Sequence, residues 1–323
     1  MIPLLNVGSK QSIPAITIRR TFTAAYQIWD GPAPRRAKQP ISNRSTGRLS
    51  TKAKQRLTIA IELLIDSAQT KRIWWKDLER YVSFKVSFIT LTLPSTQKHT
   101  DSYIVTNMLK PFLRWWRDKN PSLLYIWKAE VQDNGNIHFH ITTNAFIHWR
   151  TLRKQWNRIC DRHDYIDHVK LPDPNSTDVH GVRNIKDLAA YITGYVAKKD
   201  LYTKKLKRYH KMYDKYLKRS KESVHVLPRN YFANIKRALN CKLWDASKLL
   251  LEGPCRVVMP DNQILADLCT IEYVENSVID TDYARLYTYK AGTVHKLPAL
   301  AEAYRTHLVE IRKRCKESIA LLD

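Results

Sequence analysis

Two histidines separated by one residue, His138 and His140, are the residues of this sequence whose types and spacing point most directly to chemistry. They lie in the run from Ile137 to Thr143, where apolar and polar residues alternate as in a β-strand. Because residues i and i+2 of a strand project from the same face of a sheet, both imidazoles are expected on one side. That geometry is typical of a two-histidine metal site, although a His-x-His strand also occurs as an ordinary surface or core pair.

A third ligand, Glu130, depends on the length of the turn before this strand. The run from Leu124 to Gln132 is rich in β-branched and aromatic residues, which predicts a partner strand, and Asn134-Gly135 is a strong turn signal. A two-residue loop would turn Glu130 away from both histidines. A loop one residue longer, with Gly135 in the left-handed conformation of a bulge, would place Glu130 opposite His138.

Two imidazoles and one carboxylate with open coordination positions suit a hard or borderline divalent ion such as Mg²⁺, Mn²⁺ or Zn²⁺. The metal interpretation of Glu130, His138 and His140 therefore predicts the three-residue loop. These three residues must be positioned by a two-stranded ribbon within a sheet.

A second group of reactive side chains lies on the helix predicted for residues 185–199. Its apolar stripe consists of Ile185, Leu188, Ala189, Ile192 and Val196. Tyr191, Tyr195 and Lys198 cluster on a separate flank, about 100° around the helix from that stripe. Two phenols one turn apart can attack a phosphate, and the lysine can hold a phosphate or lower the pKa of a phenol. The alternative is that both tyrosines simply widen the buried face.

The composition favours a polyanionic partner. The chain has 323 residues, with 55 Lys and Arg against 30 Asp and Glu, which gives a formal net charge of +25. So large an excess indicates nucleic acid as the partner, against the alternative of a basic but uninvolved surface. The run from Lys198 to Lys221 interleaves cations with tyrosines, as single-stranded DNA-binding segments do.

Several classes of protein are disfavoured. The five cysteines have no C-x-x-C spacing, which predicts reduced thiols in a cytoplasmic setting and no zinc ribbon. No P-loop sequence occurs, so a P-loop motor is not expected. The N-terminal run lacks the apolar core of a signal peptide, and no segment approaches membrane-spanning length, so we expect no membrane association.

The order of elements predicts an α+β fold with a central antiparallel sheet and flanking helices. Strands are predicted at 82–94, 124–132, 137–143, 165–171, 179–182, 256–259 and 270–274; helices are predicted from about residue 51, and at 103–118, 149–160, 185–199, 231–250 and 300–322. Pro111 is expected to kink its helix. We divide the chain into a basic N-terminal arm and helix at 1–80, a nuclease domain at 81–205 and a basic, mainly helical region at 206–323.

Three motifs in order resemble those of the HUH endonucleases, and among them the rolling-circle replication initiators, or Rep proteins, of small single-stranded DNA viruses, phages and plasmids. They are the apolar strand Phe88 to Thr92, the pair His138-Phe139-His140, and the tyrosine helix from Tyr191 to Lys199. The resemblance covers roughly residues 82 to 200. It implies a ferredoxin-like or RRM-like palm.

The resemblance also implies the roles of individual residues. His138 and His140 would bind a Mg²⁺ or Mn²⁺ ion with Glu130 as third ligand, and Tyr195 with Lys198 matches the Y-x-x-K nucleophile motif. Tyr191 matches the extra tyrosine of the two-tyrosine subgroup. There each tyrosine tends to have its own lysine three residues later, whereas Tyr191 is followed there by glycine, so Tyr195 is the first choice as nucleophile.

The implied activity is nicking and rejoining of single-stranded or hairpin origin DNA through a 5′-phosphotyrosine link, with a helicase and a polymerase supplied in trans. A transposase or a relaxase is the alternative within the superfamily. A transposase would be shorter, and a relaxase commonly has three clustered histidines. The alternative from another class is a non-catalytic protein that binds single-stranded nucleic acid.

Overall fold

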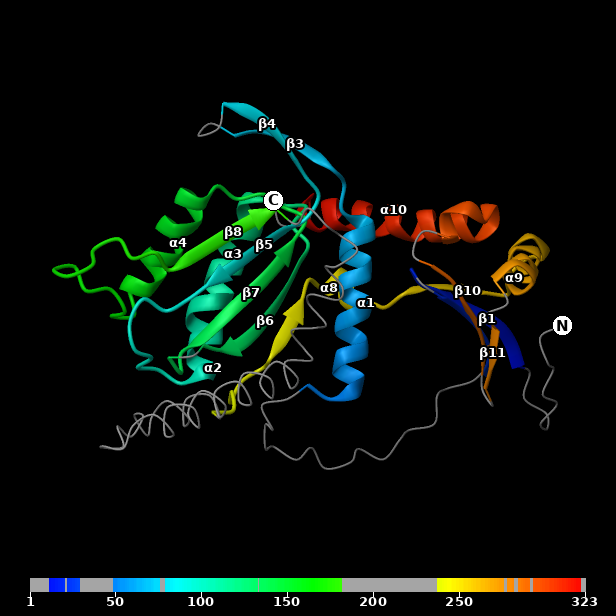
Figure 1. Ribbon diagram of the computed structural model, residues 1–323, viewed down its shortest axis with the longest axis horizontal. Coiled ribbons are helices and arrows are strands. Elements are labelled where there is room, and N and C mark those ends of the chain that lie inside the picture. Colours follow the sequence, from blue (N-terminus) through cyan, green and yellow to red (C-terminus); the bar gives the residue numbers. More distant parts are fainter. Residues whose placement is uncertain are drawn as a thin grey trace, which may run out of the picture. The chain divides into compact units, whose positions relative to one another are not determined.

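The computed structural model describes residues 12–20, 22–29, 49–75, 79–132, 134–181, 237–275, 278–281, 284–290 and 293–320 (Figure 1). The chain forms two compact units. We call Asn43–Ser247 the central unit, and Met1–Ser42 together with Lys248–Asp323 the terminal unit. The boundary expected near residue 205 lies outside the described residues, and the one expected near residue 80 falls at the start of a strand, β4.

The central unit is built on a five-stranded antiparallel sheet with the strand order β8-β5-β7-β6-β9. Its strands are β5 (Ser87–Leu91), β6 (Tyr125–Val131), β7 (Ile137–Thr143), β8 (Thr177–Gly181) and β9 (Trp244–Ala246). The burial of β7 alternates as its sequence predicts, because Ile137, Phe139 and Ile141 are fully buried while His138 and His140 are half-buried. The two histidines therefore project from the face opposite the apolar core.

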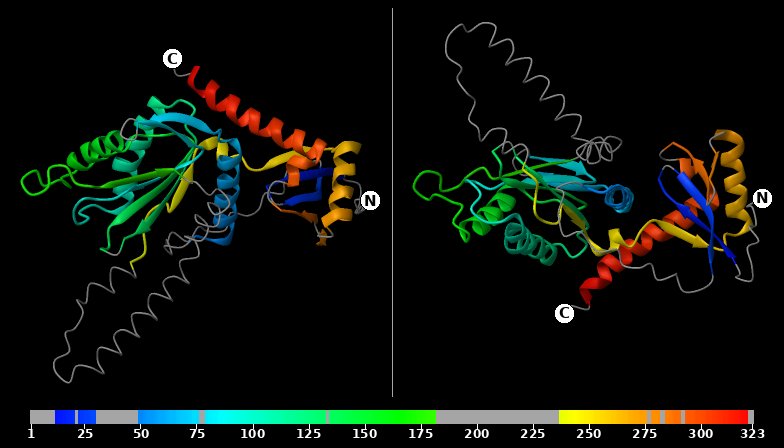
Figure 2. Two further views of the ribbon diagram at one scale, coloured as in Figure 1. Left: turned by 45° about the horizontal axis from the view of Figure 1, so that its top comes forward. Right: turned by 90° about the horizontal axis from the view of Figure 1, so that it is seen from below.

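Helices cover the apolar face of this sheet (Figures 1 and 2). They are α2 (Asp101–Ile104), a π-helical turn η2 (Val105–Leu109), α3 (Lys110–Lys119) and α4 (Trp149–Asp161). Trp116 and Trp156 fill the core between these helices and Phe139. The π turn ends shortly before Pro111, with the Lys110 amide bonded to the Val105 carbonyl five residues back. The proline expected to kink this helix thus follows a local change of hydrogen-bond pattern.

Two further elements belong to the central unit. Helix α1 (Thr51–Ser67) begins where expected, with the hydroxyl of Ser50 accepting a hydrogen bond of 3.2 Å from the Ala53 amide. Strands β3 (Lys71–Trp75) and β4 (Arg80–Phe84) form a separate ribbon. The single strand predicted at 82–94 is therefore wrong, since the chain leaves one sheet after Phe84 and enters another at Ser87.

The terminal unit has its own five-stranded antiparallel sheet, in the order β10-β1-β2-β12-β11. Its strands are β1 (Ser12–Ile18), β2 (Phe22–Trp29), β10 (Cys255–Val258), β11 (Val278–Asp280) and β12 (Ala284–Thr288). Its helices are α8 (Lys248–Leu251), α9 (Asn262–Glu275), the 3₁₀ turn η3 (Thr293–Lys296) and α10 (Pro298–Ala320). Strands from both ends of the sequence share this sheet, so the regions around the nuclease domain hold more strand than expected.

Three sequence predictions are wrong in detail, while the α+β class is confirmed. The strand predicted at 270–274 is the end of α9, because Ile264, Leu268 and Ile271 are buried at helical spacing. The described part of the helix predicted at 231–250 contains the short strand β9, which extends the central sheet. Residues 165–171 form turns rather than a strand. No helix among the described residues is long and apolar enough to span a bilayer.

Candidate metal centre

The β6–β7 ribbon has the register that a metal site requires. Glu130 pairs directly with His138, and Gly135 has a φ of +86°. The Gln132 amide donates to the Asn136 carbonyl over 2.8 Å, so three residues separate the last bonded pair. The two-residue loop is thereby excluded and the register of the three-residue loop is confirmed. Pairing at this register places a carboxylate and an imidazole on adjacent strands of one face.

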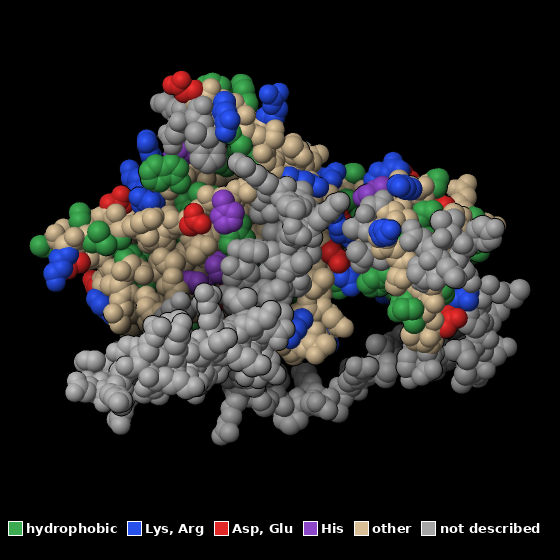
Figure 3. All heavy atoms as spheres, viewed as in Figure 1, with side chains coloured by type: hydrophobic (Ala, Val, Ile, Leu, Met, Phe, Trp, Pro, Cys, Tyr) green, Lys and Arg blue, Asp and Glu red, His purple; other side chains and the backbone are tan. Residues whose placement is uncertain are grey.

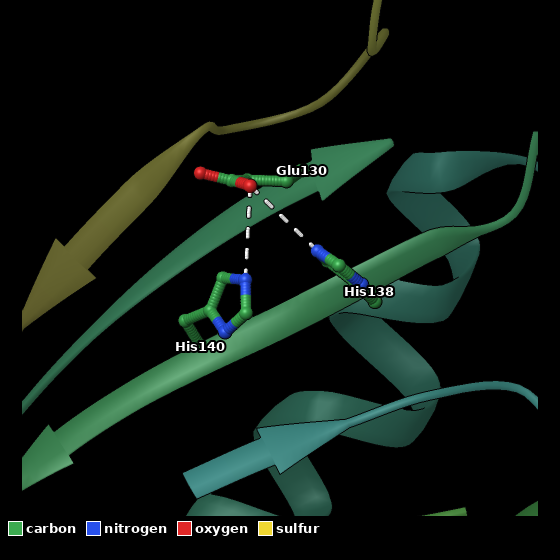
Figure 4. Close-up of side chains that lie close together, drawn as sticks. All are labelled: Glu130, His138 and His140. Carbon is green, nitrogen blue, oxygen red and sulfur yellow. Dashed lines mark ion pairs between the residues drawn. The ribbon is translucent and has the colours of Figure 1, made fainter. Parts of the chain in front are cut away.

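Three side chains converge on that face (Figure 4). The Oε2 atom of Glu130 lies 3.7 Å from Nε2 of His138 and 3.7 Å from Nε2 of His140. One ligand atom from each residue lies within 4.8 Å of the others. Histidine and acidic side chains also gather on the viewed face of the central unit in Figure 3. Since two ligands bonded to one metal ion at about 2.1 Å are separated by roughly 3 to 4 Å, this donor set fits a divalent ion.

Strand β5 fixes the ring of His140. Thr90 Oγ1 lies 3.2 Å from Nδ1 of His140, and the ring of Phe88 stacks on the imidazole with centroids 5.2 Å apart. When Nδ1 carries the proton and donates it to Thr90, the lone pair of Nε2 faces Glu130, which is the tautomer that binds metals. Thr90 therefore orients the ligand, a role that the sequence did not indicate beyond its place in the first motif.

Lys128 is a neighbour of the site that sequence reasoning missed. Its Nζ atom lies 2.6 Å from Oε1 of Glu130, and the two side chains share a face because they are two residues apart on β6. Burial by itself would raise the pKa of Glu130, but the facing imidazoles and the Lys128 ammonium outweigh it and hold that pKa well below its usual range. Glu130 is thus an ionised carboxylate, as a metal ligand must be.

The tip of the ribbon is held by a hydrogen-bonded network from the segment before α2. The side chain of Asn136 accepts from the Gln97 amide over 2.9 Å and donates to the Ser95 carbonyl over 2.8 Å. The Ile137 amide in turn donates to Oε1 of Gln97 over 2.8 Å. These bonds fix the point at which β7 begins, and with it the register of the two histidines.

A buried ion pair closes this network. Arg237 donates to both carboxylate oxygens of Asp101, over 2.6 and 2.8 Å, and also to the Gly135 carbonyl over 2.8 Å. Burial would raise the pKa of Asp101, but Arg237 and Gln97 lower it below its ordinary value. Because its partners lie more than a hundred residues away along the sequence, no local pattern could have identified Arg237 as part of the support for the ribbon.

The proposed nucleophiles, Tyr191 and Tyr195, lie outside the described residues, as does Lys198. The structure therefore brings together the three predicted metal ligands and leaves the tyrosine helix as a prediction. On the described residues the site offers two imidazoles, a carboxylate and an adjacent ammonium. Such a group can hold a divalent ion beside an anionic substrate.

Comparison with known families gives one match. The family model described as replication-associated protein ORF2 matches residues 86–200. This range starts immediately before β5, includes the three candidate ligands and extends over the positions of both tyrosines. The match supports a replication initiator of the Rep type. No curated protein and no solved structure matches the chain significantly.

Proposed function

We propose that this protein initiates rolling-circle replication by nicking single-stranded DNA at an origin and later rejoining it. The observation that carries the proposal is the convergence of Glu130, His138 and His140 on one sheet face, inside the range that matches the replication-associated family. A protein that only bound DNA would not need a carboxylate and two imidazoles held at metal-ligand separation.

The chemical step would be a transesterification by Tyr195. Its phenol oxygen attacks the phosphorus, the bond from phosphorus to the 3′ oxygen breaks, and the phenol proton is lost as the 3′ oxygen gains one. The products are a 5′-phosphotyrosine link and a free 3′-OH that a polymerase can extend. Because the phosphodiester energy is kept in the link, rejoining needs no nucleotide cofactor.

Other residues would prepare this step. Lys198, three residues after Tyr195, would hold the phosphate or lower the pKa of the phenol, and Tyr191 would be a second nucleophile. Glu130, His138 and His140 would hold a Mg²⁺ or Mn²⁺ ion. Bound there, the ion would supply Lewis-acid polarisation of a non-bridging phosphate oxygen. Lys128 would add a fixed positive charge beside that phosphate.

The test is a cleavage assay on labelled single-stranded oligonucleotides with Mn²⁺, followed by mass spectrometry of the DNA-linked peptide. We expect a covalent adduct on Tyr195 that is lost in the Tyr191→Phe, Tyr195→Phe double variant and in EDTA. His295→Ala, which removes an exposed histidine of the terminal unit, is the matched control for His138→Ala and should cleave normally.

Two results would contradict the proposal. One is the absence of any adduct with the wild-type protein on origin-containing DNA of its own replicon. The other is an undiminished adduct in the double tyrosine variant. Cleavage retained in a His138→Ala, His140→Ala variant would reject the metal site while leaving the nucleophile in place.

A further inference from the structure

Helix α4 carries a basic surface that the proposed chemistry does not use. Its buried residues pack on the apolar face of the central sheet, which is the face opposite the candidate metal centre. The outward side carries Arg150, Arg153, Lys154 and Arg158. With a rise of 1.5 Å per residue, this row is about 12 Å long. Backbone charges recur every ~3.4 Å along one strand of a duplex, so the row can follow several successive phosphates.

These cations line a hollow of about 600 Å³ together with Trp149 and the turns before β8. The guanidinium carbons of Arg150 and Arg153 lie 5.1 and 4.9 Å from the centre of the Trp149 ring. Stacking on an aromatic ring restricts a guanidinium while its N–H groups stay able to bind an anion. The side chains are thus ordered before a ligand arrives, which lowers the entropic cost of binding.

The acidic residues of the hollow are engaged at its border. Asp161 lies 2.7 Å from Nε2 of His168, and Asp173 accepts a hydrogen bond of 2.8 Å from the side chain of Asn157. Arg153 donates to Asn175 over 2.6 Å, and its Nε atom is buried with no hydrogen-bond partner among the described residues. A buried guanidinium N–H calls for an acceptor, and a phosphate oxygen supplies one.

We propose that this surface, the α4 hollow, binds the phosphodiester backbone of the DNA that flanks the cleaved bond. Calling the ligand DNA rests on the proposed function, whereas the demand for a polyanion rests on the charge and geometry of α4 alone. The hollow lies on the helix-covered side of the sheet, so it holds flanking DNA rather than the scissile phosphate. The arrangement of cations around one tryptophan also provides an aromatic surface beside the phosphates.

The experiment measures equilibrium binding of a fluorescent oligothymidylate, about three helical turns of a duplex in length, to the full chain in EDTA, so that cleavage plays no part. In the triple variant Arg150→Ala, Arg153→Ala, Arg158→Ala we expect the Kd to rise on the order of tenfold or more near ~0.1 M salt. The slope of log Kd against log salt should fall by about 2, since each phosphate contact on a single strand contributes roughly 0.7. A triple Arg→Lys variant should retain most of the slope but bind more weakly than wild type, because lysine lacks the stacked planar group.

The matched control removes three exposed cations elsewhere, in Lys119→Ala, Lys290→Ala, Lys296→Ala, and so has the same net charge. Equal Kd values for this control and the α4 variant would overturn the proposal. Competition by poly-glutamate as effective as that by an equally charged oligonucleotide would also overturn it, in favour of an acidic protein partner. If the triple variant unfolds, Arg158→Ala alone should still raise the Kd severalfold, since Arg158 is exposed. Failure of these tests would leave the covalent adduct of the proposed function untouched.

Discussion

The two five-stranded antiparallel sheets of this chain have similar architecture and different surfaces. On the central sheet, Glu130, His138 and His140 converge with Lys128 beside them. On the terminal sheet, the comparable cross-strand contacts are neutral or stacked: the hydroxyl groups of Thr17 and Tyr26 lie 2.9 Å apart, and Arg256 lies over the Tyr26 ring. The family match covers strands β5 to β8 of the central sheet and includes no part of the terminal one.

The difference shows that register and residue type, rather than sheet topology, make a reactive site. A shift of one residue in the β6–β7 ribbon would move Glu130 to the other face. The central unit fixes this register with a bulged turn, a side-chain network and a buried ion pair, as described above. The experiments that follow test whether those devices belong to the site or only to the stability of the fold.

The largest effect should come from the ligands themselves. We expect the His138→Ala, His140→Ala variant to lose Mn²⁺ affinity by more than about a hundredfold, measured by calorimetry, since removing even the groups that support a ligand commonly costs roughly 10- to 100-fold. The same pair of losses on the terminal sheet, Thr17→Ala with Tyr26→Phe, should leave Mn²⁺ affinity unchanged. Equal affinity in both double variants would mean that the ion binds elsewhere.

Removal of the buried carboxylate of Asp101 should have the next largest effect. Asp101→Ala leaves Arg237 without its bidentate partner, so we expect a loss of about 3 kcal/mol in the free energy of unfolding. Mn²⁺ affinity should fall as well, because the ribbon tip is released. In the terminal unit, Asp267 accepts the Ala299 and Leu300 amides at the start of α10, and Asp267→Ala should cost about 1 kcal/mol without changing Mn²⁺ affinity.

Two glycines with positive φ allow a closer comparison. Gly135 in the ribbon turn has a φ of +86°, and Gly253 in the terminal unit has a φ of +111°. Changing either to alanine should cost about 1 kcal/mol of stability, measured by urea denaturation, because side chains rarely adopt these conformations. Only Gly135→Ala should also weaken Mn²⁺ binding. If both variants bind Mn²⁺ like wild type, the turn does not control the ligand register.

The smallest effect concerns pH. The lowered pKa of Asp101 means that its ion pair with Arg237 contributes stability above the ordinary carboxyl pKa of about 3.9, and that this contribution is lost as the pH falls through the lower value of the folded state. Stability should therefore decline below about pH 4 in wild type, and this decline should be shallower in Asp101→Asn. Parallel curves for the two proteins would show that Asp101 is not responsible.

The sequence predicted the parts of this structure that depend on neighbouring residues. The ribbon follows from alternation and from Asn134-Gly135, and the requirement that Glu130 face His138 selected the correct loop length. Helices α1, α4 and α10 were expected from their apolar spacing and, for α1, from its cap. In each case the signal lies within about four residues of the structure it specifies.

The errors came from long-range contacts. The strand predicted at 270–274 contains β-branched residues, but packing of Leu268 and Ile271 in the core keeps the segment helical. β9 is a strand because the edge of β6 accepts it, from Lys128 paired with Trp244 onward. The contact of Arg237 with Asp101 likewise had no sequence signal.

The pairing of β1 with β10 makes the central unit an insertion within the terminal one. Ile18 lies opposite Cys255, so the terminal sheet cannot be completed until the ribosome has synthesised the residues that follow the whole central unit. During translation the central unit is complete first, while the β1–β2 hairpin waits without its outer strands, and an isolated hairpin is marginal in water. A messenger truncated after residue 247 would therefore yield a folded metal centre attached to an unfolded N-terminus.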